Sequence, residues 1–224
     1  MASAACTVWW AAPVDPDRAP TLVRLLDDHE RERLTRFRRP ADRARYLAAH
    51  ALARLVLGGS GRTAAALRFD RTCRCGAAHG RPVLPGGPGF SLSHSGDLVG
   101  VAVRPGAAVG LDVEQVRDIA DLPALAAHVW SPTERARDGT PGPAAFFRTW
   151  TRKEAVLKAA GDGLATPMAD ITLAADGGIV AWPDRGSWWL RDLSPAPDHP
   201  AAVAGPGADA PEIVEADGDA VLQG

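Results

Sequence analysis

Apolar side chains recur every three or four positions in the first part of the chain. This spacing runs through residues 21–39 and predicts a helix there. A second helix is predicted from Pro40, because proline fits a first helical turn and an apolar stripe containing Tyr46, Leu47 and Leu55 follows it. The glycine-rich residues 58–61, GGSG, end this second helix.

Short apolar runs bounded by turn residues predict strands. VWWAAPV, residues 8–14, is one such run. In FSLSHSGDLVGVAVRP, the runs around Phe90–Leu92 and Leu98–Val103 flank the residues SGD, which predicts a hairpin. A further strand is predicted at residues 109–116, VGLDVEQV, after the turn RPGA.

The second half of the chain repeats this order of helix and then strands. Helices are predicted around residues 121–130 and across 144–160, with a loop containing SPTE between them. The segments ITLAADGGIVAWP and SWWLRDL are typical of hairpin strands, and AAVAG is the closing strand. From Gly205 the chain has five acids, no bases and little periodicity, so we expect this tail to be partly disordered.

Each half therefore ends in a strand of small residues, VGVAV in the first and AAVAG in the second. This pattern agrees with α+β or mixed layers in two similar lobes, of which we predict the α+β fold. We place the N-terminal lobe at residues 1–105, the C-terminal lobe at 106–204 and the acidic tail at 205–224.

Charge is distributed unequally between the two halves. Residues 1–105 contain 16 Arg and no Lys against nine acids, a net charge of +7, whereas residues 106–224 have a net charge of −9. This asymmetry indicates that one half meets an anion while the other could hold a cation; two ordinary solvated surfaces are the alternative.

Composition sets the general class of protein. With 46% hydrophobic and 23% charged residues, the 224-residue chain is typical of a globular enzyme and unlike a disordered chain. It has neither an apolar run of about 18 residues nor the basic start of a signal peptide, so we expect a cytoplasmic protein without a membrane partner. We expect its three cysteines to be reduced; Cys73, Cys75 and His79 have poor spacing for zinc.

A candidate metal site comes from acidic residues of the second half. Asp112 and Glu114 in GLDVE alternate on one face of a strand, where two carboxylates repel unless a cation lies between them. Oxygen ligands favour Mg²⁺ or Mn²⁺ over zinc. Glu154 is a candidate third ligand, and Lys158, one helical turn later, could reach an anion held by the metal. An ordinary surface Glu–Lys pair is the alternative interpretation.

Candidate anion contacts come from the first half. Ser93 and His94 lie at the predicted hairpin turn, where both can donate hydrogen bonds to a phosphate. Arg81 offers a guanidinium fork for the same purpose. A nucleophilic Ser–His pair is disfavoured, because neighbouring side chains in a strand point in opposite directions and no GxSxG elbow is present.

Four ordered blocks of sequence resemble one enzyme family. HGRPVL, FSLSHS, VGLDVE and WTRKEAVLKAAGDGL resemble the motifs of the Sfp-type 4′-phosphopantetheinyl transferases. The resemblance implies two pseudo-twofold-related lobes, each a small antiparallel sheet packed with a long helix, with coenzyme A bound between them. It also implies an enzyme that transfers 4′-phosphopantetheine from coenzyme A to a serine of an apo acyl or peptidyl carrier protein, as in polyketide or nonribosomal peptide biosynthesis. The length of the two-lobed chain favours a monomer.

The resemblance also implies roles for individual residues. Asp112, Glu114 and Glu154 are similar to the family's magnesium ligands, with Glu154 also the base near the carrier serine. Lys158 is similar to the lysine that contacts the coenzyme A phosphates and assists departure of adenosine 3′,5′-bisphosphate. The remaining coenzyme contacts that the resemblance implies are Ser93, His94, Arg33, Arg45 and Arg81.

Two other functions remain as alternatives. A metal-dependent nucleotide phosphodiesterase would use the same carboxylates with water as the acceptor. A non-catalytic nucleic-acid-binding protein would use the Arg-rich first half, but its arginines are mixed with acids and not interleaved with aromatic residues. We therefore expect no nucleic-acid partner.

Overall fold

The chain divides into two compact units. The structure is a computed structural model that describes residues 4–59, 61–72, 76–77, 80–161, 163 and 166–224. Unit 1 contains the chain up to Gly106 together with Ile213–Gly224, and unit 2 contains Ala107–Glu212. Each unit has its own sheet, long helix and hydrophobic cluster, which confirms the predicted α+β class.

Unit 1 is built on a four-stranded sheet with the strand order β2–β3–β1–β9. Its pairs are antiparallel except for the parallel pair of β1 and β9. The described elements of this unit are β1 (Cys6–Ala11), α1 (Pro20–Val23), α2 (Asp28–Arg36), α3 (Pro40–Gly58), α4 (Gly61–Ala66), β2 (Gly89–Ser95), β3 (Leu98–Arg104), β9 (Ile213–Asp217) and α8 (Gly218–Gln223).

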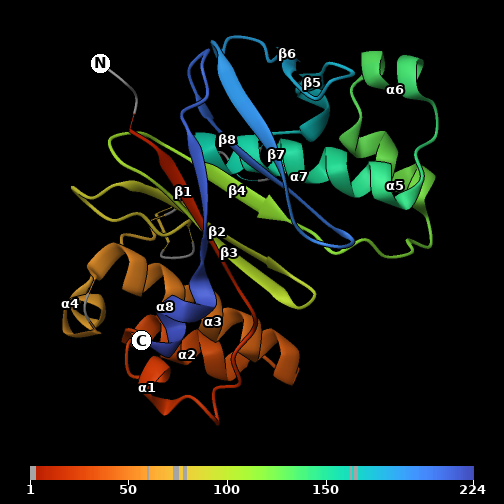
Figure 1. The fold of residues 1–224 in the computed structure, drawn as a ribbon. Helices are drawn as coiled ribbons and strands as arrows, with labels where there is room; N and C mark the ends of the chain where they lie inside the picture. The colour runs from red at the N-terminus through yellow and green to blue at the C-terminus, as the bar shows by residue number, and fades with distance from the viewer. Residues whose placement is uncertain (1–3, 60, 73–75, 78–79, 162, 164–165) are drawn as a thin grey trace. The chain divides into compact units, whose positions relative to one another are not determined.

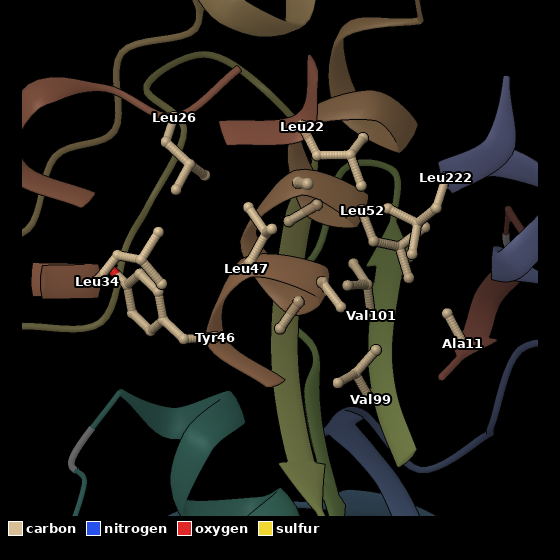
Figure 2. Close-up of a cluster of buried hydrophobic side chains, with 14 of the residues drawn as sticks. Ala11, Leu22, Leu26, Leu34, Tyr46, Leu47, Leu52, Val99, Val101 and Leu222 are labelled. Atoms are coloured by element: carbon tan, nitrogen blue, oxygen red, sulfur yellow. The ribbon is translucent and has the colours of Figure 1, made fainter. Parts of the chain in front are cut away.

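The long helix α3 packs its apolar face on this sheet. Figure 2 shows Leu52 of the helix next to Val101 of β3 and Leu47 in the same cluster. The side chains of Leu47, Leu52, Val99 and Val101 are fully buried. Proline occupies the first turn of α3, and Gly59 ends the helix with a positive φ of 75° that favours glycine. Local sequence signals therefore set both ends of this helix.

One predicted helix is two helices in the structure. The segment 21–39 contains the short α1 and the nine-residue α2, because Asp27 caps α2 and interrupts the helical spacing. The Asp27 side chain accepts a hydrogen bond from the backbone of Glu30, and the Glu30 side chain accepts one from the backbone of Asp27. This reciprocal capping box starts a new helix at residue 28.

The prediction of a partly disordered acidic tail is wrong for residues 213–223, which form β9 and α8. Strand β9 pairs with β1, and Leu222 of α8 joins the buried cluster of unit 1. The acids of this segment make specific contacts: Glu215 accepts a hydrogen bond from the Trp10 indole at 2.7 Å, and Asp219 accepts one from the backbone of Ala12 at 2.9 Å. Figure 1 shows this blue segment beside the red strand β1.

Unit 2 contains an antiparallel sheet with the order β4–β8–β7 and a smaller β5–β6 pair. Its described elements are β4 (Gly110–Val113), α5 (Leu122–Val129), α6 (Pro132–Asp138), α7 (Pro143–Ala160), the 3₁₀ helix η2 (Met168–Asp170), β5 (Thr172–Leu173), β6 (Ile179–Ala181), β7 (Trp188–Ala196) and β8 (His199–Pro206).

The long helix α7 lies directly on β4 and β8 (Figure 1). The closest approach is at Gly110 of β4, where a Cβ atom would overlap the backbone carbonyl of Ala155 and lie 2.5 Å from the backbone nitrogen of Ala159. A glycine at this position is therefore what allows the strand to touch the helix backbone.

The segment SPTE begins a helix in the structure, so its prediction as a loop is wrong. Ser131 caps α6 and Glu134 completes a capping box, with hydrogen bonds in both directions between the two residues. The S-x-x-E spacing is itself a helix-start signal. Of the helices in the described part of the chain, none combines the length and apolarity that crossing a membrane requires.

Candidate active site

Two carboxylates of the candidate site come from β4 and the residue that follows it. Asp112 pairs with Ala202 of β8 and is 5% exposed, and the Glu114 backbone donates a hydrogen bond to the Pro200 carbonyl at 3.1 Å. Because side chains alternate along an extended chain, Asp112 and Glu114 share the face of Gly110, which packs against α7.

Helix α7 supplies Glu154 and Lys158, which are four residues apart and therefore on one side of the helix. The Lys158 ammonium donates hydrogen bonds to Asp112 Oδ1 at 2.7 Å and to the Leu111 carbonyl at 3.0 Å. A largely buried carboxylate is stabilised by a cationic partner of this kind. The structure thus brings Lys158 to the acidic strand β4.

Glu154 is in an environment that favours its neutral form. Burial raises the pKa of Glu154, the charge of Asp112 raises it further, Lys158 opposes the rise and Glu114 adds to it; together they move the pKa from 4.5 to about 7. A carboxyl group with this pKa exchanges protons readily at neutral pH, as a general base must.

Glu114 is the most exposed residue of the segment 110–114, and it forms an ion pair with Arg117. The Arg117 guanidinium forms this ion pair at 3.1 Å and lies over the Phe147 ring, 4.6 Å from the centroid. Arg117 was not among the residues that the sequence predicted for the site. The signal available was a basic residue three positions after Glu114 in the acidic half of the chain.

The three carboxylates have the chemistry of a site for a hard dication, because oxygen ligands suit Mg²⁺ and Mn²⁺. The charges of Asp112 and Glu114 both raise the pKa of Glu154. In the described part of the chain, however, no group of three or more Asp, Glu, His or Cys side chains has the arrangement of a metal site. In this structure Asp112 is paired with Lys158 and Glu114 with Arg117. The zinc alternative at residues 73, 75 and 79 lies outside the described residues.

The predicted phosphate contacts Ser93 and His94 lie on β2 in unit 1. They pair with Gly100 and Val99 of β3 and alternate between the two faces of the sheet, so Ser93 is buried and His94 is exposed. Arg45 of α3 lies near this hairpin, since its guanidinium donates a hydrogen bond to the Gly96 carbonyl at 2.6 Å. Arg45 and the β2–β3 turn therefore meet in the structure.

Arg33 borders a basic pocket in unit 1. The pocket has a volume of about 270 Å³ and is lined by Arg33, Arg36, Arg71, His29, His50, Tyr46, Gly80 and Pro82. Arg81 lies between the last two of these residues and is exposed. The sequence did not identify Arg36 or Arg71 as site residues; Arg36 follows Arg33 by one helical turn, whereas Arg71 reaches the pocket only through the tertiary fold.

The chain is similar in sequence to known proteins. The family model of the 4′-phosphopantetheinyl transferase superfamily matches residues 108–203, which include Asp112, Glu154 and Lys158. The 4′-phosphopantetheinyl transferase HetI of a Nostoc species is 34% identical over 208 residues, covering 87% of this chain and 85% of the relative. The phosphopantetheinyl transferase of a Thraustochytrium species is 35% identical over 191 residues, covering 75% and 64%.

A more distant relative spans nearly the whole chain. The 4′-phosphopantetheinyl transferase Sfp of Bacillus subtilis is 25% identical over 218 residues, covering 92% of this chain and 94% of the relative. The fold and the matches define the class of protein as an α+β transferase. The chain belongs to the 4′-phosphopantetheinyl transferase superfamily, which confirms the resemblance drawn from its motifs.

Proposed function

We propose that this enzyme transfers the 4′-phosphopantetheine group of coenzyme A to a serine of an apo acyl or peptidyl carrier protein. The observation that carries the proposal is the arrangement on α7, where Glu154, with a pKa of about 7, lies one helical turn from Lys158, which contacts Asp112. Membership of the transferase superfamily supports the same reaction.

Glu154 and Lys158 have complementary roles in this reaction. The Glu154 carboxylate accepts the proton of the carrier serine as the serine oxygen bonds to the phosphorus that bears the pantetheine arm. The bond from that phosphorus to the oxygen of the nucleotide breaks. Lys158 stabilises the negative charge on the departing adenosine 3′,5′-bisphosphate.

Asp112, Glu114 and Glu154 would hold one Mg²⁺ or Mn²⁺ ion. When bound, such an ion neutralises charge on the pyrophosphate of coenzyme A. Asp112 lies on a strand that α7 covers and Glu114 directly follows this strand, so the sheet of unit 2 sets their backbone positions. Release of Lys158 from Asp112 would at the same time free its ammonium for a phosphate oxygen.

The basic residues of unit 1 would bind the nucleotide part of coenzyme A. Arg33 lines the pocket of about 270 Å³, Arg81 lies in sequence between its lining residues Gly80 and Pro82, and Arg45, Ser93 and His94 belong to or contact the β2–β3 hairpin. Guanidinium groups suit this ligand because their planar forks bind phosphate with two parallel hydrogen bonds. We also propose that the enzyme acts as a monomer in the cytoplasm.

Intact-protein mass spectrometry tests the proposed reaction. The enzyme, coenzyme A, Mg²⁺ and an apo carrier protein are incubated together, and the carrier is expected to gain about 340 Da as a covalent modification. A carrier with its acceptor serine changed to alanine serves as the control and should gain nothing.

The same experiment separates the alternative functions. Consumption of coenzyme A without any gain in carrier mass would indicate a phosphodiesterase and would overturn the proposal. No consumption of coenzyme A with any member of a panel of fatty acid, polyketide and nonribosomal peptide carriers would also contradict it. The carrier that is modified fastest identifies the partner class.

A further inference from the structure

A buried lysine lies beside the catalytic glutamate in α7. Lys153 is fully buried, and its ammonium donates hydrogen bonds to Glu134 at 2.5 Å and to the Val129 carbonyl at 2.7 Å. Glu134 is the capping-box glutamate of α6 and also accepts hydrogen bonds from the backbones of Ser131 and Leu173. Through this one pair, α7 is tied to α5, α6 and β5.

Unit 1 contains a pair of the same construction. Arg54 of α3 is fully buried and donates to Glu30, the capping-box glutamate of α2, at 2.6 Å. It also donates to the cap residue Asp27 at 2.7 Å. Arg71 and His50 contact Glu30 as well, at 2.8 Å and 3.0 Å.

The two ion pairs are built from the same kinds of elements in the same order along the chain. In each unit a short helix with a capping box precedes a long helix that begins with proline, and the long helix carries a buried cation back to the capping-box glutamate. We call Arg54–Glu30 the unit 1 anchor and Lys153–Glu134 the unit 2 anchor. A buried ion pair is weak evidence for stability, because desolvation of both charges offsets their attraction. Such a pair does fix the relative positions of its two side chains, because a buried charge without a partner is energetically costly.

We propose that each anchor is a positioning device that sets the rotation and axial position of the long helix bearing its unit's site residues. Lys153 directly precedes Glu154, so a rotation of α7 that broke the Lys153–Glu134 contact would also turn Glu154 and Lys158 away from Asp112. The backbone contact at Gly110 limits the same helix from the strand side. The unit 2 anchor therefore supports the catalytic step.

The unit 1 anchor supports the nucleotide-binding residues instead. Helix α3 carries Arg45, and Glu30 also binds Arg71, whose backbone carbonyl accepts a hydrogen bond from Gly80 at 2.7 Å. Gly80 directly precedes Arg81. Loss of the unit 1 anchor would therefore disturb coenzyme contacts while leaving α7 unchanged.

Two double variants test this inference, which rests on the proposed function. Each removes both charges of one anchor, so that no lone buried charge remains: E134Q/K153M in unit 2 and E30Q/R54M in unit 1. The unit 2 variant is expected to lower kcat by about 10²-fold with little change in the KM for coenzyme A, since small displacements of reacting groups cost this much. The unit 1 variant should raise the KM for coenzyme A by about tenfold and change kcat little.

Stability and binding measurements distinguish positioning from simple loss of folding. The control is Ile171→Ala, which opens a cavity at a fully buried core position of unit 2 outside α7 and should reduce stability without this kinetic split. If E134Q/K153M does not fold, Glu134→Asp keeps the charge but shortens the side chain by one methylene, which weakens the contact with Lys153 and should give a smaller change of the same kind. Equal effects of all variants on kcat and KM, in proportion to their melting temperatures, would overturn the inference.

Calorimetric binding of coenzyme A and of Mn²⁺ tests the anchors without any turnover. The unit 1 variant should weaken coenzyme A binding, and the unit 2 variant should weaken Mn²⁺ binding. These two affinities can be measured even if the wild-type enzyme modifies no carrier protein. A failure to modify any carrier would count against the proposed function alone. Unchanged affinities in both variants would count against the anchors alone.

Discussion

The ammonium of Lys158 lies 2.7 Å from the carboxylate of Asp112, although the two residues are 46 positions apart in the chain. This contact joins helix α7 to strand β4 at the acidic end of the candidate site. It also places a cation beside the one carboxylate of the site that is almost fully buried. Lys158 therefore links the stability of unit 2 to its proposed chemistry.

Lys158→Met is expected to lower kcat by about 10²-fold or more, because the leaving group loses a cationic contact. It should also lower the free energy of unfolding by about 1–3 kcal/mol, because Asp112 remains buried without this partner. Steady-state kinetics and urea denaturation measure the two effects. Lys158→Arg, which keeps the charge, is the control and should recover most of the stability. Near-normal turnover in the methionine variant would show that Lys158 does not assist the leaving group.

Glu154→Gln removes the proposed base while keeping the size of the side chain. Loss of general base catalysis commonly costs about 10²–10⁴ in rate, so turnover should fall far more than the affinity for coenzyme A. Single-turnover mass measurements give the rate, and calorimetry gives the affinity. Wild-type turnover at saturating Mg²⁺ would rule out this role for Glu154.

The pKa of Glu154 makes a prediction about stability and pH. The folded-state pKa is raised from 4.5 to about 7, so between these values the folded protein holds a proton that the unfolded chain has released. The contribution of this carboxyl to stability is therefore complete below pH 4.5 and is lost as the pH rises toward 7. Urea denaturation in EDTA should show this decline in the wild type and not in Glu154→Gln. Parallel stability curves for the two proteins would contradict it.

Gly110→Ala is expected to impair both folding and catalysis. The added Cβ would overlap the Ala155 carbonyl, so β4 and α7 would have to separate. A core overpacking of this kind typically costs about 1–3 kcal/mol or more. The matched control is Gly178→Ala, whose Cβ would meet its nearest neighbour, Asp176, at an ordinary 3.4 Å. Melting temperatures should fall for the first variant only, and an equal fall in both would argue against the close contact.

Leu222→Ala tests the packing of the C-terminal segment. Leu222 is 9% exposed within the unit 1 cluster, so its truncation should cost about 2–5 kcal/mol of unfolding free energy. Val214→Ala, at a 40% exposed position of β9, should change stability by less than about 0.5 kcal/mol. Chemical denaturation compares the two. Equal stability of both variants would mean that α8 does not belong to the folded core.

Local signals made the long helices predictable from the sequence. The helix beginning at Pro40 and the helix across 144–160 correspond to α3 and α7, because proline, glycine and apolar spacing all act within a few residues. The S-x-x-E box of α6 is an equally local signal, but a loop was predicted at this position. The error there lay in the interpretation and not in the sequence.

Contacts between residues far apart in the chain could not be predicted from the spacing of residue types. Strand β9 pairs with β1 across more than 200 positions, and an acidic tail gives no sign of the strand edge that it completes. The candidate acids Asp112 and Glu114 followed from the alternation of side chains in a strand, whereas the Lys153–Glu134 pair depends on packing between elements. A polar residue that contributes to a site only by positioning another residue is difficult to predict from the sequence.

Anomalous diffraction from crystals grown with coenzyme A and Mn²⁺ tests the proposed site most directly. One anomalous peak should lie within about 2.3 Å of carboxylate oxygens from Asp112, Glu114 and Glu154, with Lys158 turned from Asp112 toward a phosphate oxygen. A manganese peak elsewhere in a complex with coenzyme A bound, or Glu154 pointing away from the ion, would contradict the proposed arrangement.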